Sequence, residues 1–351
     1  MNNKKFFTKA LLKWNCNDNK REMPWKGEKD PYKIWISEII LQQTRVQQGL
    51  AYYQRFIKTF PDAQSLAAAP EQKVFKLWEG LGYYSRCRNL IASAKFIDGE
   101  LDGKFPETYS DILTLKGVGA YTASAIASFA YNQPYAVVDG NVFRVLSRFF
   151  GIETPVDIAA GKKLYSLLAG ELLDKKNPGI YNQAIMDFGA IICKPAQPLC
   201  DSCPLQLKCI AFNKQLVNVL PVKEKSIKRK ERFFNYLIVD YAGSFYVHKR
   251  SAKDIWQGLY EFILLETKQA LTEADLLKTE LFVSIFNKKK YSITAVSGTY
   301  KQQLTHQTIN GKFFHIKINS PLKFKTDLVL ATREQISHLP FPKFIASYLI
   351  D

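Results

Sequence analysis

The sequence has no hydrophobic run that approaches the roughly 20 residues needed to span a bilayer as a helix. Its basic start, residues 1–14, lacks the small-residue cleavage site of a secretory signal peptide. We therefore expect a cytoplasmic protein without a membrane anchor. Internal repeats and low-complexity tracts are also missing, which excludes repeat architectures and favours packed globular domains.

Acidic residues are scarce, since 32 Asp and Glu stand against 49 Lys and Arg, for a formal net charge of +17. Such a balance favours a polyanionic partner, and nucleic acid is the first candidate. Charge alone leaves open a basic soluble protein without such a partner. The length of 351 residues suits about two domains, and the 47% apolar content is that of globular proteins.

Cysteine is rare as well, but four of the six cysteines lie in one short stretch: Cys193, Cys200, Cys203 and Cys209. In a reducing compartment this crowding favours a metal site over disulfides. Four thiolates on a loop after a helix can enclose one iron-sulfur cluster. Structural zinc is the alternative, although zinc sites usually show two tight Cys pairs and this stretch has one.

Helical patterns dominate the first two thirds of the chain. Asp30 fits an N-cap and Pro31 the first helical position of a helix that continues to Leu41. Further helical segments are expected over residues 75–79, 88–96, 121–129, 142–149 and 181–192.

A basic stretch, residues 223–230, reads as a solvated connector, and alternating patterns typical of strands follow over residues 234–239 and 313–318. The predicted organisation is a mainly α region over residues 1–220, a linker over 221–232, and an α+β domain over 233–351.

Two glycines, Gly117 and Gly119, lie one residue apart between two helical segments. Without side chains, this turn can bring backbone N–H groups against a phosphate at the start of a helix. The pattern predicts a helix-hairpin-helix. An ordinary tight connection gives the same local pattern and stays open.

Glu38 shares a helical face with apolar Ile34 and Leu41. A carboxyl on such a face loses hydration and can hold a proton near neutral pH. The pattern alone favours a different explanation, in which Glu38 is satisfied by a structural partner or turned towards water. Asp139 ends an apolar run and begins a helix, so capping, with help from Asn141, is its expected local role. A fixed negative charge beside a developing cation is the functional alternative.

Several motifs in order resemble the helix-hairpin-helix DNA glycosylase superfamily, and most closely the A/G-specific adenine DNA glycosylases (MutY family). They are residues 23–25, 37–44 (Ser-Glu-Ile-Ile-Leu-Gln-Gln-Thr), 80–86 (Gly-Leu-Gly-Tyr-Tyr-Ser-Arg), the hairpin, 139–142 (Asp-Gly-Asn-Val) and the four cysteines. The resemblance implies two α-helical subdomains with a cleft between them, a 4Fe-4S cluster on the cysteines, and a C-terminal domain of Nudix-like fold.

The resemblance also implies the chemistry. Glu38 would protonate N7 of an extruded adenine, while Asp139 would face the sugar cation with Tyr121 and Asn141 beside it. Bifunctional relatives such as endonuclease III carry a Lys where this chain has Tyr121, so the resemblance implies a monofunctional enzyme that leaves an abasic site.

The implied DNA contacts cover three places. Gln43 and Tyr83 would fill the hole left by the flipped base. Four residues would line the adenine pocket: Trp25, Lys26, Leu41 and Gln183. The remaining DNA contacts would come from Gln42, Thr44, Gly117 and Gly119. Core packing is the alternative role of Tyr83. The implied partner is double-stranded DNA with an adenine mispair, bound by a monomer.

The C-terminal third departs from the family pattern. Residues 256–262 resemble a family motif with Tyr260 in place of Trp, and the Nudix hydrolase signature with its glutamates is missing, so no pyrophosphatase activity is expected. In place of a Phe-Ser-His loop that reads 8-oxoguanine, the chain has Leu304, Thr305 and His306. Thr305 keeps a hydroxyl and His306 an imidazole for hydrogen bonding.

Two other functions compete with adenine removal. One is a glycosylase with lyase activity on oxidised pyrimidines, against which Tyr121 argues. The other is an iron-sulfur DNA-binding protein without catalysis, in which Glu38 and Asp139 only pack and cap.

Overall fold

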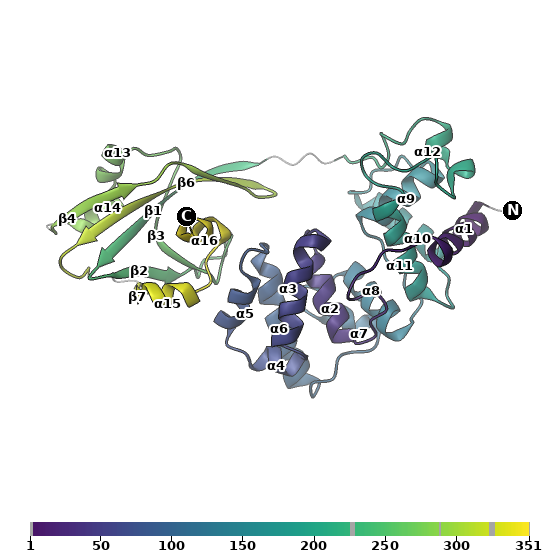
Figure 1. The fold of residues 1–351 in the computed structure, drawn as a ribbon, viewed down its shortest axis with the longest axis horizontal. Coiled ribbons are helices and arrows are strands. Elements are labelled where there is room, and N and C mark those ends of the chain that lie inside the picture. Colours follow the sequence, from purple (N-terminus) through teal and green to yellow (C-terminus); the bar gives the residue numbers. More distant parts are fainter. Residues whose placement is uncertain (1–2, 225–228, 288, 323–326, 351) are drawn as a thin grey trace. The chain divides into compact units, whose positions relative to one another are not determined.

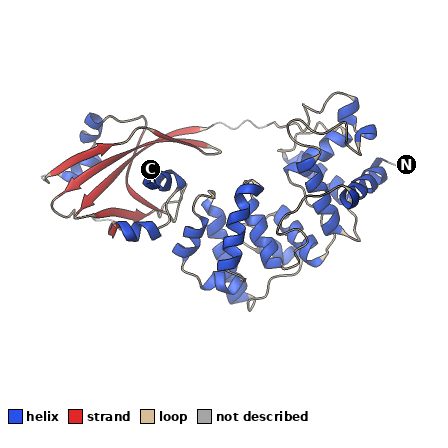
Figure 2. Cartoon of the chain, in the orientation of Figure 1, coloured by secondary structure: helices blue, strands red, loops and turns tan. Residues whose placement is uncertain are grey.

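The computed structural model of the protein describes residues 3–224, 229–287, 289–322 and 327–350. The chain divides into two compact units, one of Met1–Ala68 with Asn89–Ser226, and one of Ala69–Arg88 with Ile227–Asp351. Figure 2 shows helices throughout the first two thirds of the chain and strands in the last third. The predicted fold class, a helical region followed by an α+β region, is confirmed.

The first unit is helical. Its elements, labelled in Figure 1, are α1 (Asn3–Asn17), α2 (Pro31–Leu41), α3 (Val46–Thr59), α4 (Ala63–Ala68), the greater part of α6 (Tyr84–Glu100), α7 (Tyr109–Thr114), α8 (Ala120–Tyr131), α9 (Gly140–Phe150), α10 (Ala159–Leu172), α11 (Pro178–Ile191), the 3-10 turn η1 (Gln206–Lys208) and α12 (Ile210–Asn213). The predicted start of α2 is confirmed, because the Asp30 side chain accepts from the backbone N–H groups of Tyr32 and Lys33 and Pro31 takes the first helical position.

Aromatic side chains from α1, α9 and α11 form part of the core of this unit. Phe7 packs on Phe149 with ring centroids 4.9 Å apart, and Trp14 meets the edge of Phe188 at 5.0 Å. All four side chains are at least 95% buried. Burial stabilises by about 1.5–3 kcal/mol per large apolar side chain, and these ring pairs pack α1 against both α9 and α11.

The second unit contains α5 (Glu71–Trp78) and a mixed sheet. The strands are β1 (Lys230–Tyr241), β2 (Ser244–Lys249), β3 (Tyr260–Thr267), β4 (Tyr291–Val296), β5 (Tyr300–Gln303), β6 (Gln307–Ile318) and β7 (Val329–Thr332), in the order β4-β6-β1-β3-β2-β7, with β5 paired to β6. β1 and β6 run parallel and the other paired strands antiparallel. The helices are α13 (Glu273–Leu277), α14 (Glu280–Phe286), α15 (Arg333–His338) and α16 (Lys343–Ile350).

Alternation along the strands gives the sheet two buried faces. On one face, Leu237 and Phe314 pack with Phe282 of α14. On the other, the ring of Tyr236 stacks on that of Phe313 at 5.4 Å. Both predicted strand segments lie inside observed strands, 234–239 in β1 and 313–318 in β6.

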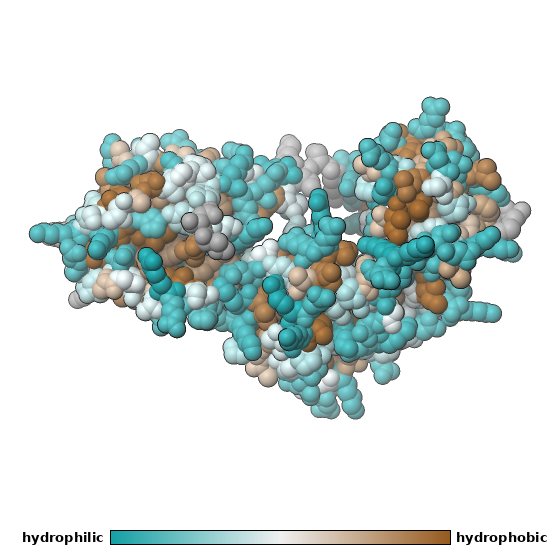
Figure 3. All heavy atoms as spheres, viewed as in Figure 1, coloured by the Kyte–Doolittle hydropathy of each residue, from teal (hydrophilic) through white to brown (hydrophobic). Residues whose placement is uncertain are grey.

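The predicted linker, residues 221–232, overlaps residues 225–228, which lie outside the described residues. β1 begins at Lys230, four residues before the alternating pattern at 234–239. The proposed boundaries at 220 and 233 therefore stay predictions. Among the described residues, none of the helices combines the length and apolarity required to cross a membrane. Hydrophilic residues cover most of the face seen in Figure 3.

Candidate active site

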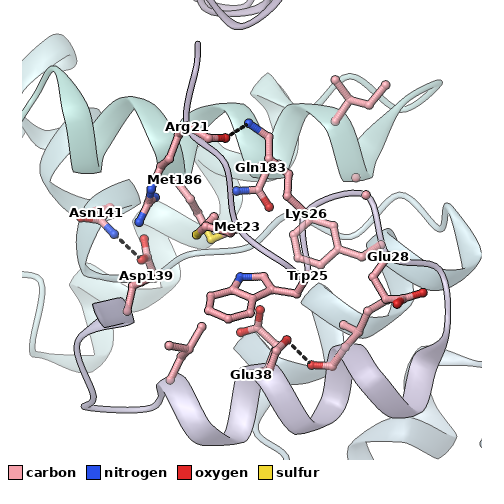
Figure 4. A pocket seen from close by; sticks show the side chains of 18 of the residues that line it. Arg21, Met23, Trp25, Lys26, Glu28, Glu38, Asp139, Asn141, Gln183 and Met186 are labelled. Atoms are coloured by element: carbon pink, nitrogen blue, oxygen red, sulfur yellow. Dashed lines mark hydrogen bonds between the residues drawn. The ribbon is translucent and has the colours of Figure 1, made fainter. Parts of the chain in front are cut away.

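A cavity of about 390 Å³ opens in the first unit. Its wall comes from α2, α8, α11, the turn before α9 and the strap of residues 21–29, as Figure 4 shows. The lining includes most residues expected at an adenine pocket and catalytic centre: Trp25, Lys26, Glu38, Leu41, Thr44, Tyr121, Asp139, Asn141 and Gln183. Glu38 and Asp139, far apart in the sequence, thus share one cavity.

Glu38 lies on the buried face of α2, with 8% of its surface exposed. Loss of hydration raises the pKa of its carboxyl from 4.5 to about 7. A hydrogen bond with the Tyr121 hydroxyl opposes this rise, and the negative charge of Asp139 adds to it. Glu38 therefore carries a transferable proton near neutral pH, which a surface glutamate does not.

Asp139 combines both roles considered for it. As the N-cap of α9, its Oδ1 accepts from the Val142 backbone N–H at 2.8 Å, and its Oδ2 accepts from Asn141 Nδ2 at 2.8 Å. Loss of hydration raises the pKa of this carboxyl, while these hydrogen bonds lower it. The hydrogen bonds fix the carboxylate in place at the cavity wall, where it can face a developing cation.

Tyr121, in the first turn of α8, presents its hydroxyl to the same cavity. The hydroxyl lies 3.5 Å from the sulfur of Met186 and also hydrogen-bonds Glu38. Burial raises the pKa of the phenol well above its usual value, so the side chain stays neutral. A neutral phenol can hold the Glu38 carboxyl in place but cannot form a Schiff base.

Asp187 was not predicted from the sequence, yet it organises the strap over the cavity. Its side chain is fully buried, with Oδ1 2.8 Å from the Arg21 guanidinium and Oδ2 3.1 Å from the Lys26 ammonium. Gln183 Nε2 donates to Oδ1 at 2.9 Å. The available signal was an acidic residue four positions after Gln183 in an otherwise apolar helix.

Substitution Asp187→Asn is expected to loosen the strap without removing either carboxyl from the active centre. Two partly exposed cations lose their counter-charge, so we expect about 1–2 kcal/mol of lost stability and weaker substrate binding with a smaller change in the chemical step. Single-turnover rates at increasing enzyme concentration separate the two effects. If the enzyme concentration that gives half the maximal rate were the same in Asp187→Asn and the parent, Asp187 would not hold the strap for substrate binding.

Helix α9 connects the turn at Asp139 to the cysteine loop. Arg144 donates from Nη2 to Asn141 Oδ1 at 2.8 Å and from Nε to the carbonyl of Cys193 at 2.7 Å. Arg148, one turn later, donates to the sulfur of Cys193 at 3.5 Å and to the carbonyl of Lys194 at 2.7 Å. The position of Asn141 therefore depends on the order of this loop.

The four predicted cysteines follow α11 on one stretch of chain, Cys193–Cys209. No group of three or more His, Cys, Asp or Glu side chains in the described ranges is arranged to hold a metal ion, so their shared site stays a prediction. Burial, together with negative charge on Cys193, Cys209 and Cys200, raises the pKa of the Cys203 thiol to about 12. When one of these thiols ionises, its negative charge disfavours ionisation of the others. All four can be thiolates together only if a metal centre binds between them. The donor set thus fits an iron-sulfur group.

The glycine turn joins α7 to α8, as the hairpin interpretation expected. Gly117 has a φ of +80°, and a Cβ there would lie 2.8 Å from the Cβ of Asn89, so glycine is required. Gly119 is the N-cap of α8. The free N–H groups of this helix start form a site suited to a phosphate.

The two residues expected to enter the duplex both have left-handed backbones. The φ values are +58° at Gln43 and +47° at Tyr83, a conformation that costs about 1–3 kcal/mol outside glycine. Tyr83 is 45% exposed, which excludes the core-packing alternative. The neighbouring Gln42 hydrogen-bonds Thr122 Oγ1 from its Nε2 at 3.2 Å and so anchors this turn to α8.

Thr305 and His306 lie in the turn between β5 and β6, where Leu304 N–H donates to the Gln307 carbonyl at 2.7 Å. With Tyr83 they line a cavity of about 520 Å³ in the second unit. The hydroxyls of Tyr83 and Thr305 are in hydrogen-bond contact. The structure therefore brings these three residues together in the second unit.

Comparison with known proteins identifies the family of the chain. Residues 36–168 match the HhH-GPD superfamily of base excision DNA repair proteins, and residues 235–350 match the NUDIX domain. An adenine DNA glycosylase of Buchnera aphidicola from Schizaphis graminum is 36% identical over 310 residues, which cover 88% of each chain. The chain belongs to the adenine DNA glycosylase family.

Two further proteins extend the comparison. The mouse adenine DNA glycosylase is 42% identical over 218 residues, or 59% of this chain and 42% of the mouse protein. The structure of a thermostable thymine-DNA glycosylase is 30% identical, with a TM-score of 0.56, and the match covers 60% of this chain and 97% of that one. The chain is thus an enzyme of base excision repair that hydrolyses N-glycosyl bonds.

Proposed function

We propose that this enzyme removes adenine mispaired with 8-oxoguanine or guanine and leaves an abasic site. The observation that carries the proposal is the pairing of Glu38 and Asp139 in one cavity with different environments. Burial raises the pKa of Glu38 to about 7, so a large fraction of its carboxyl is protonated at neutral pH, while hydrogen bonds from Asn141 and Val142 favour the anion of Asp139. One acid and one anion are what the two developing charges require.

In the proposed reaction, the Glu38 carboxyl transfers its proton to N7 of the extruded adenine. The C1′–N9 bond then breaks and its electron pair leaves with the base, so that positive charge develops on the sugar. The Asp139 carboxylate stabilises this charge. Water adds to C1′, and the proton it loses returns to Glu38, which restores the starting state.

Monofunctional chemistry follows from the side chains available. The position that would supply an amine to the sugar holds the phenol of Tyr121. Of the two lysines that line the cavity, Lys26 faces the Asp187 carboxylate at 3.1 Å and Lys29 donates to the Phe129 carbonyl at 2.8 Å. These contacts disfavour the bifunctional alternative, which needs a free amine.

The base opposite the adenine is proposed to bind the cavity of Tyr83, Thr305 and His306. An exposed ring, a hydroxyl and an imidazole can stack on a purine and hydrogen-bond its modified edge. The proposed partner is duplex DNA bound by a monomer in the cytoplasm, with Gln43 and Tyr83 inserted into the stack and a phosphate at Gly117 and Gly119.

Cys193, Cys200, Cys203 and Cys209 are proposed to hold a 4Fe-4S cluster. When bound, the cluster would neutralise the thiolates and cross-link the loop that Arg144 and Arg148 contact. Visible absorption of the purified protein, together with iron and sulfide content, tests this. A colourless protein with one zinc per chain would refute the cluster and favour the zinc alternative.

Single-turnover incubation with end-labelled duplexes tests the proposed function. Alkali-labile sites should form at adenine opposite 8-oxoguanine or guanine, and not at adenine opposite thymine. Strand breaks without alkali, or a borohydride-trapped adduct, would favour the bifunctional alternative. Unaltered DNA after long incubation with cluster-loaded protein would favour a binding protein without catalysis.

The rate of adenine removal should depend on pH in two directions. Because Glu38 must be protonated, kcat/KM should fall as pH rises above about 7, by about tenfold per pH unit. Because Asp139 must be ionised, the rate should also fall at acidic pH. Since burial raises the pKa of Asp139, this fall should begin at a higher pH than for an ordinary aspartate. Measurement between pH 5 and 9 checks both limbs, and a rate that still rises at pH 9 would contradict the role of Glu38.

A further inference from the structure

The segment Ala69–Arg88 carries Tyr83 and belongs to the second unit together with the sheet. We call it the docking segment. It contacts two loops of that unit, namely residues 256–260, which lead into β3, and residues 339–342, which join α15 to α16. Its polar contacts on both loops are side chains bonded to backbone groups.

Glu79 provides the central contact with the loop between α15 and α16. Its Oε1 accepts from the Phe341 backbone N–H at 2.8 Å, and its Oε2 lies 2.8 Å from the Lys76 ammonium. Lys76 in turn donates to the Leu339 carbonyl at 3.0 Å. Glu79 is only 20% exposed, so these contacts are partly shielded from water.

The loop that receives Glu79 is itself rigid. The Pro340 carbonyl accepts from the Tyr260 N–H at the start of β3, at 2.9 Å. Phe341 is 1% exposed, and its ring stacks on Phe262 of β3 at 5.6 Å. Glu79 therefore reaches a backbone donor that belongs to the core of the sheet.

The loop before β3 contacts α5 and the last residue of the docking segment. Gly258 has a φ of +90°, and a Cβ there would lie 3.2 Å from the ring of Phe75. Arg88 donates from Nη1 to the Gln257 carbonyl at 2.6 Å. These contacts give a role to the motif at residues 256–262, which the catalytic proposal does not use.

Glu79 is adjacent to the groups that hold Tyr83. Trp78 donates from its Nε1 to the Gly82 carbonyl at 3.1 Å, and Arg86 donates to the same oxygen at 3.2 Å. The next residue is Tyr83, whose left-handed backbone needs such support and whose hydroxyl contacts Thr305. A shift at Glu79 would therefore move Trp78, and with it the carbonyl that fixes Tyr83.

We propose that Glu79 is a positioning residue that sets the preference for 8-oxoguanine over guanine opposite the adenine. It would act by holding Tyr83 against Thr305, and it touches neither base. This proposal rests on the proposed function, because it assigns a determinant to the cavity in which the opposite base is placed.

The test compares single-turnover rates of adenine removal opposite 8-oxoguanine and opposite guanine, with the full cluster-loaded chain. Glu79→Ala is expected to lower the ratio of the two rates at least fivefold, mainly through the 8-oxoguanine duplex. Glu79→Gln should keep the ratio, because its amide oxygen can accept from the same Phe341 N–H. Glu334→Ala, an exposed glutamate of α15, is the matched control.

Glu79→Asp keeps the charge but shortens the reach, so it should behave like Glu79→Ala and provides a second variant if the alanine form does not fold. In a Tyr83→Phe background, Glu79→Ala should have little further effect on the ratio. An unchanged ratio in Glu79→Ala, an equal loss of both rates, or a Gln variant as impaired as Ala would overturn the proposal. A parent enzyme that removes adenine without any preference would overturn it too, whereas one that removes no adenine would overturn the proposed function itself.

Discussion

Glu38→Gln is expected to lower the rate of adenine removal by about 10²–10⁴-fold while leaving DNA binding nearly intact. The amide has the shape of the protonated acid and can keep its contact with Tyr121, but it has no proton to transfer to N7. The loss should therefore appear in the single-turnover rate at saturating enzyme. Binding of the mispaired duplex should stay within a few-fold, as measured by a gel shift.

The matched control is Glu153→Gln, which makes the same chemical change at an exposed position outside the cavity. It should retain the parental rate. A Glu38→Gln enzyme that removes adenine within threefold of the parent would exclude Glu38 as the proton donor. In that case the proton would have to reach the base from water or from another group in the cavity wall.

Local signals predicted the start of α2, because Asp30 and Pro31 act on their own backbone and need no tertiary partner. The same holds for the glycine turn before α8. The burial of Glu38 was not accessible in this way. Its apolar neighbours on one helical face are compatible with either a buried or a rotated helix, and only the packing of α2 against other helices decides between them.

The meeting of Glu38 with Asp139 depends on how α2 and α9 pack, which no spacing in the sequence encodes. It was expected only because the ordered motifs resembled a known family. The role of Asp187 could not be predicted either. A single acidic residue in a mostly apolar helix does not indicate that Arg21 and Lys26, distant in sequence, form ion pairs with it. The placement of residues 69–88 with the sheet unit was likewise not predictable, because its contacts with residues 339–341 are to backbone groups that any sequence carries.

The burial that makes Glu38 an acid should also destabilise the folded protein at high pH. The folded state holds a proton on Glu38 up to about pH 7, whereas the unfolded chain releases it near 4.5. Between these values the folded state binds more protons, so stability falls as pH rises. The stabilisation is complete below pH 4.5 and is lost by about pH 7, which amounts to about 3 kcal/mol.

Glu38→Gln removes this titration, so its stability relative to the parent should rise with pH. The difference in unfolding free energy between variant and parent should be about 2.5 kcal/mol more favourable to the variant at pH 8 than at pH 5, as measured by urea unfolding monitored on the helical signal. Glu153→Gln, the same chemical change at an exposed site, is the matched control. If Glu38→Gln showed no such rise with pH, the carboxyl would be ionised in the folded protein at neutral pH and could not serve as the acid. Loss of activity together with a gain in alkaline stability is thus the combined signature expected of this one residue, because both effects arise from the same unhydrated carboxyl.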